Sequence, residues 1–72
     1  MSAQSKKLIV MAGQIASFFR PYPHDQAVRS IAEHINKFWT RKMRDEFLDL
    51  PEIRDGTSDP LLVAASKSIR AG

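Results

Sequence analysis

The sequence predicts an all-α protein, a small bundle of three to four short helices built on a helical hairpin. Apolar residues recur at spacings of three and four along most of the chain, as they do on one face of an α-helix. Prolines and helix-capping residues divide this pattern into segments. No stretch alternates apolar and polar residues as a half-buried strand does. We expect residues 1–72 to form one small domain with flexible ends at residues 1–4 and 71–72.

The first predicted helix covers residues 5–20, with Ser5 as a candidate N-cap. Pro21 and Pro23 end it, because proline lacks an amide donor and restricts the residue before it. Its apolar residues at helical spacing form the predicted inner face: Leu8, Met11, Ile15 and Phe18.

The second predicted helix begins near Pro23 or His24 and packs against the first as a hairpin. Its predicted inner face has the same spacing: Val28, Ile31, Ile35 and Phe38. Small residues on both helices should let them approach closely: Ala12, Ala16, Ala27 and Ala32.

Two shorter helices follow. Thr40 is a candidate N-cap for a third helix over residues 41–50, which Pro51 ends, and residues 52–58 are expected to form a loop. Asp59 and Pro60 are a favoured N-cap and first-turn pair for a fourth helix that extends to Arg70. Apolar residues line the inner faces of both helices: Met43, Phe47, Leu50, Leu61, Leu62, Ala65 and Ile69.

The composition excludes several kinds of chemistry. The chain has no cysteine, so it has no disulfides, thiolate metal sites or cysteine nucleophile, and we expect a cytoplasmic protein. The apolar stretch at residues 8–19 is far shorter than the roughly 20 residues needed to span a bilayer, so we expect no membrane anchor.

No catalytic or metal site is predicted. His24 and His34 lie at opposite ends of the second helix and cannot share a metal within one chain. The three glycines form no phosphate-binding loop, and nothing suggests an enclosed pocket that would adapt a carboxylate for acid–base catalysis. We expect this chain by itself to bind no cofactor.

The candidate binding segment is residues 33–44, which contains the only tryptophan and a basic cluster. Phe38 continues the inner face and is expected to be buried. Trp39 lies one position off that face, so it either wedges between the second and third helices or stands at the rim of an interface.

The basic cluster is Arg41, Lys42 and Arg44, in the first turn of the third helix. Cations are disfavoured at this positive end of the helix dipole, so local stability does not explain them. They either bind an acidic or phosphate-bearing group on a partner or form a solvated face. With a net charge of +3, they also leave a small nucleic-acid-binding protein as an alternative, although the acidic residues that follow the cluster argue against it.

The apolar band of the first helix is wider than a two-helix contact needs, because Phe19 extends the face that Phe18 already covers. Either the third and fourth helices cover the surplus or a partner protein does. The candidate partner-binding residues are therefore the following: Phe19, Phe38, Trp39, Arg41, Lys42 and Arg44.

Three segments also carry a family resemblance. Residues 11–19 (MAGQIASFF), 31–39 (IAEHINKFW) and 41–44 (RKMR), with a weaker echo at residues 59–61, resemble the delta subunit of cytoplasmic NAD-dependent formate dehydrogenases. This chain has Gly13 where the family usually has Asn, and Thr40-Arg41 where it usually has Asp-Pro.

The resemblance implies a non-catalytic accessory subunit of a large enzyme complex. In that family the alpha subunit carries a molybdenum or tungsten bis-pterin guanine dinucleotide centre and iron–sulfur clusters, and the beta and gamma subunits pass electrons through FMN to NAD. The resemblance further implies that the delta subunit binds the alpha subunit and aids its stability or its molybdenum-cofactor maturation.

Overall fold

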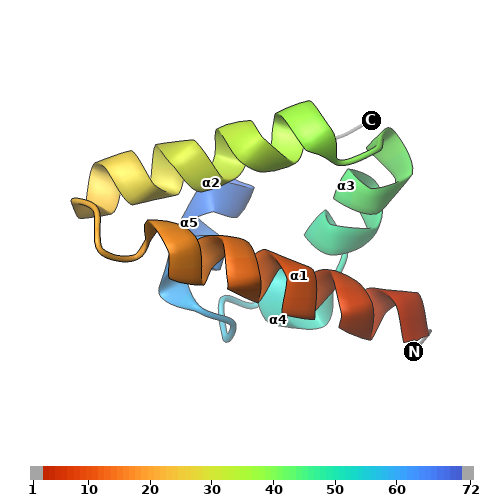
Figure 1. The fold of residues 1–72 in the computed structure, drawn as a ribbon. Helices are drawn as coiled ribbons and strands as arrows, with labels where there is room; N and C mark the ends of the chain where they lie inside the picture. The colour runs from red at the N-terminus through yellow and green to blue at the C-terminus, as the bar shows by residue number, and fades with distance from the viewer. Residues whose placement is uncertain (1–2, 71–72) are drawn as a thin grey trace.

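The computed structural model describes residues 3–70, and this part of the chain forms five α-helices and no strand. The predicted all-α fold is confirmed. Figure 1 shows α1 and α2 running in opposite directions, with α3 leading back from the end of α2 towards α1 and α5 packed behind both. The helices are α1 (Ala3–Phe19), α2 (His24–Phe38), α3 (Arg41–Leu48), α4 (Pro51–Arg54) and α5 (Pro60–Ser66).

The ends of the chain differ in part from the prediction. α1 begins at Ala3, so Ser5 lies inside the helix and is not its N-cap. Residues 3 and 4, which we expected to be flexible, form part of its first turn. Residues 1–2 and 71–72, for which flexibility was also expected, lie outside the described part of the chain.

The predicted helix starts at residues 24, 41 and 60 are confirmed. The Thr40 Oγ1 accepts a hydrogen bond from the Met43 N–H over 3.2 Å, which caps α3. The Asp59 Oδ1 accepts one from the Leu61 N–H over 2.9 Å, and Pro60 occupies the first turn of α5. The starts of α3 and α5 depend on these short-range bonds, which explains why the sequence alone located them.

Pro51 was predicted to end the third helix, and the structure gives it a different place. α3 ends earlier, at Leu48, and Pro51 is the first residue of α4, which occupies part of the predicted loop. A first-turn amide has no partner within its helix, so the missing N–H of proline costs nothing there. Gly56, with a φ of 78°, then adopts the left-handed conformation in the connection to α5.

The core is shared by all five helices rather than enclosed by the hairpin alone, because α5 packs against both α1 and α2. The four alanines predicted to permit close approach are all buried. Larger side chains from all five helices and the segments that adjoin them complete the core: Leu8, Ile31, Ile35, Trp39, Phe47, Leu50, Ile53, Leu61, Leu62 and Ile69.

The predicted inner face of α1 is wrong at its end. Phe18 is 69% exposed, and Met11 and Ile15 are only partly buried. The buried line runs instead through Leu8, Ala12 and Ala16. Small alanine side chains let the neighbouring helices pack closely along that line, and the bulkier residues are thereby left at its edge.

Phe38 was predicted to be buried and is 65% exposed. α2 ends at Phe38, and Trp39 adopts an extended backbone conformation while its N–H still donates to the Ile35 carbonyl. This change of direction brings the Trp39 indole into the core, where it meets the Phe47 ring edge-on at 5.6 Å between centroids. Trp39 is 6% exposed, so its core alternative is the correct one.

Asn36 fastens the segment after α5 to α2. Its Nδ2 donates to the Ser68 carbonyl over 3.0 Å, and its Oδ1 accepts from the Arg70 N–H over 2.8 Å. Ile69, between these two residues, is buried. The prediction that the last helix extends to Arg70 is wrong, because α5 ends at Ser66. The two hydrogen bonds of the Asn36 side chain hold residues 68–70 against α2 instead.

The ion pair between Arg20 and Asp59 should make stability depend on acid pH. Burial raises the pKa of Asp59, but the hydrogen bonds from Arg20 and from the Leu61 N–H, together with the Arg20 charge, outweigh it and lower the pKa below its usual 3.8. The stabilisation is present above the unfolded-state pKa of about 3.9 and is lost as pH falls through the lower folded-state pKa. Because the Arg20 side chain is half exposed, we expect the ion pair to contribute at most about 1 kcal/mol to the free energy of unfolding.

Urea unfolding of the wild type and of Asp59→Asn between pH 7 and pH 2 measures the contribution of this ion pair to stability. Asparagine keeps the N-cap and removes the charge, so the wild-type advantage should shrink on acidification. A difference that is constant with pH would contradict the assigned role of the ion pair.

Gly13 is replaceable by alanine. It lies inside α1, and a Cβ added there would meet nothing within 4 Å. Gly13→Ala should therefore stabilise the protein by about 0.5–1 kcal/mol through lower chain entropy in the unfolded state. A higher urea midpoint with an unchanged m-value is the expected result. A lower midpoint would show that the helix needs glycine at this position.

Candidate functional site

An open apolar groove of about 420 Å³ lies between α1 and α2, and we take it as the candidate binding site. α1 supplies most of its wall, α2 contributes His34, and the buried Trp39 closes one part of it. The groove exists because the alanines of α1 face the core and leave the larger side chains along this edge. Its lining residues are Met11, Gln14, Ile15, Phe18, Phe19, His34 and Trp39.

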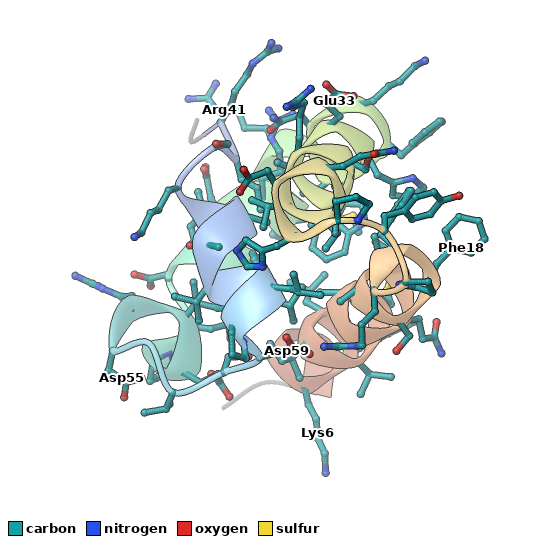
Figure 2. All side chains as sticks on the ribbon, turned by 90° about the vertical axis from the view of Figure 1, so that its left-hand side faces the viewer. Lys6, Phe18, Glu33, Arg41, Asp55 and Asp59 are labelled. Carbon is teal, nitrogen blue, oxygen red and sulfur yellow. The ribbon has the colours of Figure 1, made fainter. Side chains whose placement is uncertain are left out.

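Exposed aromatic rings flank the groove, and we call Phe18, Tyr22 and Phe38 the aromatic rim. The Phe18 ring meets Phe19 edge-on at 5.0 Å between centroids, and the Phe38 ring lies 4.8 Å from the His34 ring. Figure 2 shows Phe18 projecting outward from α1. Large aromatic side chains exposed together around an apolar depression are typical of protein interaction sites.

The groove is lined mainly by apolar side chains, together with Gln14 and His34. Among the described residues that line it, none is a carboxylate. The Lys37 Nζ lies 5.7 Å from the centroid of the Phe38 ring, which brings a positive charge to the rim. Glu33 extends from a different side of the molecule than Phe18 (Figure 2). The groove therefore favours an apolar ligand that carries negative rather than positive charge.

Residues 7–66 match the family of the NADH-dependant formate dehydrogenase delta subunit FdsD. The chain belongs to this family. The matched range contains every residue that lines the groove, together with the aromatic rim. Comparisons with curated proteins and with solved structures gave no match.

The family resemblance seen in the sequence is thus confirmed, and the chain is a delta subunit of a formate dehydrogenase complex. The match extends past the segments that first carried the resemblance and includes α4 and all of α5. The delta-subunit family therefore corresponds to the whole bundle rather than to the hairpin alone.

The six predicted partner-binding residues do not form one surface in this delta subunit. Phe19 and Trp39 line the groove, and Phe38 belongs to its rim. Arg41 and Lys42 are exposed on α3, and Figure 2 shows Arg41 on the opposite side of the molecule from Phe18. The aromatic and basic parts of the predicted site thus face in different directions.

Arg44 has an internal role that the sequence did not reveal. Its side chain is partly buried, and its Nη1 donates over 3.0 Å to the Asn36 carbonyl, in the last turn of α2. A cation in this position satisfies a free carbonyl and meets the negative end of the α2 dipole. The unfavourable position of Arg44 at the start of α3 is therefore compensated by the end of α2.

Five groove residues were not predicted as binding residues: Met11, Gln14, Ile15, Phe18 and His34. Phe18 was predicted to face inward and instead dominates the rim. One signal was available, because two adjacent phenylalanines on one helix point about 100° apart and cannot both face a narrow core. The sequence did not indicate which of the two would be exposed.

Within residues 3–70, no three His, Asp or Glu side chains come together to hold a metal ion. A second open depression, between α2 and α5, has a mixed lining that combines charged and polar side chains such as His24, Asp25 and Arg29 with Val28 and two alanines. No helix in the described part has the length and apolar composition needed to cross a bilayer.

Proposed function

We propose that this delta subunit is a non-catalytic accessory subunit that binds the catalytic alpha subunit through the α1/α2 groove, in a cytoplasmic complex that also contains beta and gamma subunits. The binding would aid the stability of the alpha subunit or its molybdenum-cofactor maturation. The observation that carries the proposal is the exposure of Phe18 and Phe38 beside an apolar groove in a protein of this family.

Burial of the two exposed phenylalanine rings would favour the binding of a partner. Burying an exposed phenylalanine ring contributes about 2 kcal/mol, so two such rings can anchor a small interface. The two rings contribute little to the stability of the isolated chain, because each stays largely open to water in the folded state. The rim is therefore better explained by a partner than by the folding of the isolated chain.

The cofactors expected in the complex do not fit this chain. It has no cysteine for iron–sulfur clusters and no glycine-rich loop for FMN or NAD. As the family resemblance implies, the bis-pterin centre and the iron–sulfur clusters would lie on the alpha subunit, and the beta and gamma subunits would pass electrons through FMN to NAD.

No observation favours the alternative of a nucleic-acid-binding protein. Arg20 and Arg54 form ion pairs with Asp59 and Asp49, and Arg44 is bound to the end of α2. Three of the eleven Lys and Arg side chains are therefore engaged within the chain, and the acidic residues that follow the basic cluster argue further against contacts with phosphates.

Co-purification tests the proposal. A tagged delta subunit expressed in its host should retain the alpha subunit through washing, and deletion of the delta subunit should lower formate-dependent NAD reduction. In the deletion strain, a low amount of alpha subunit would indicate a stabilising role, and a normal amount with a low molybdenum or tungsten content would indicate maturation. A tagged chain that captures no formate dehydrogenase subunit, with NAD reduction unaffected by the deletion, would refute the proposal.

A further inference from the structure

The groove has the form of a site for one helix. Met11, Ile15 and Phe18 follow one another along α1 at spacings of four and three, so this wall extends for two helical turns, about 10 Å. A depression between two helices accepts the ridge of a third, with apolar anchors at positions i, i+3 or i+4, and i+7.

We propose, on the basis of the proposed function, that the groove binds an amphipathic helix of the alpha subunit that places a carboxylate beside Lys37. The apolar face of this helix lies against Met11, Ile15 and Phe18. Its acidic residue meets the cation above the Phe38 ring.

Charge complementarity selects this occupant. The part of the groove lining that the structure describes holds His34 and no carboxylate, and Lys37 stands at the rim. A basic helix would bring like charges together, whereas an acidic one gains an ion pair in surroundings that aromatic rings partly shield from water.

The same argument disfavours a second copy of this chain. In a symmetric dimer through the groove, each rim meets an identical rim. Lys37 would then face a copy of the same groove, which offers it no carboxylate among its described lining residues. A partner of different sequence is therefore the occupant to test.

Charge reversal in the intact complex tests the ion pair. Lys37→Glu should weaken capture of the alpha subunit by about tenfold at low salt, and this loss should shrink at high salt because the charges are screened. Lys6→Glu is the matched control, since it makes the same change in net charge at an exposed residue that points away from Phe18 (Figure 2). Equal capture by both variants at low salt would overturn the acidic-helix inference and leave the proposed function standing.

Photo-crosslinking in the same complex identifies the occupant. Benzoylphenylalanine in place of Gln14, an exposed groove residue, should crosslink to an amphipathic helical segment of the alpha subunit that contains Asp or Glu. The same group in place of Lys6 should not crosslink to that segment. Crosslinking to a second delta subunit, to a non-helical or acid-free segment, or to nothing in an intact complex would overturn the inference. Failure of the wild-type chain to capture the alpha subunit would instead refute the proposed function.

Discussion

Trp39→Ala is expected to unfold most of the isolated delta subunit. The Trp39 side chain is buried and meets the ring of Phe47, which is fully buried. Removing a buried aromatic ring lowers the free energy of unfolding by about 3–5 kcal/mol, because packing contacts are lost and a cavity is left behind. A single-core domain of this size has about 3–5 kcal/mol of stability in total. Far-UV circular dichroism with urea titration should show a lost or strongly shifted transition.

Phe38→Ala is the matched control, because it removes a large aromatic ring from the adjacent residue. Phe38 is mostly exposed, so its loss should change the free energy of unfolding by less than about 1 kcal/mol. If Trp39→Ala stayed folded with an unchanged urea midpoint, the core position of the indole would be wrong.

The double substitution Phe18→Ala with Phe38→Ala is expected to abolish capture of the alpha subunit while the delta subunit stays folded. Both rings are exposed beside the groove, so their removal opens no core cavity. Central aromatic anchors typically contribute more than 1 kcal/mol each to an interface, and together these two should contribute about 3 kcal/mol, or roughly 100-fold in affinity. Pull-down of the alpha subunit and circular dichroism of the same preparation measure the two properties.

Val10→Ala controls for the loss of exposed apolar surface on α1. Val10 is about half exposed and does not line the groove, so capture should remain at the wild-type level. If the double variant captured the alpha subunit as well as Val10→Ala does, the groove would not be the docking site.

The candidate site was predictable only in part. Phe19, Phe38 and Trp39 were singled out from the sequence and lie in or beside the groove. Phe38 was expected to be buried and is exposed, whereas Trp39, for which a core and an interface position were both open, is buried. A periodic pattern assumes that the helix continues. At Trp39 the backbone turns into an extended conformation, and this turn buries the indole and exposes the preceding ring.

The basic residues were treated in the sequence as one cluster, either for a partner or as a solvated face, and the structure separates Arg44 from the other two. Arg44 reaches back eight residues to the Asn36 carbonyl, whereas Arg41 and Lys42 remain exposed on α3. The dipole argument treated α3 as an isolated helix. It could not include the end of α2, which the chain reversal at residues 39–40 brings within reach of Arg44.

The sequence by itself determined the all-α class, the starts of α2, α3 and α5, and the family. Helix starts depend on groups two to four residues apart, such as Thr40 with Met43 and Asp59 with Leu61, so they can be read locally. Only the tertiary structure decided which side of each helix is buried. That choice depends on the helices that arrive from elsewhere in the chain, and here close packing along the alanines of α1 turned Phe18 outward to form the rim of the groove.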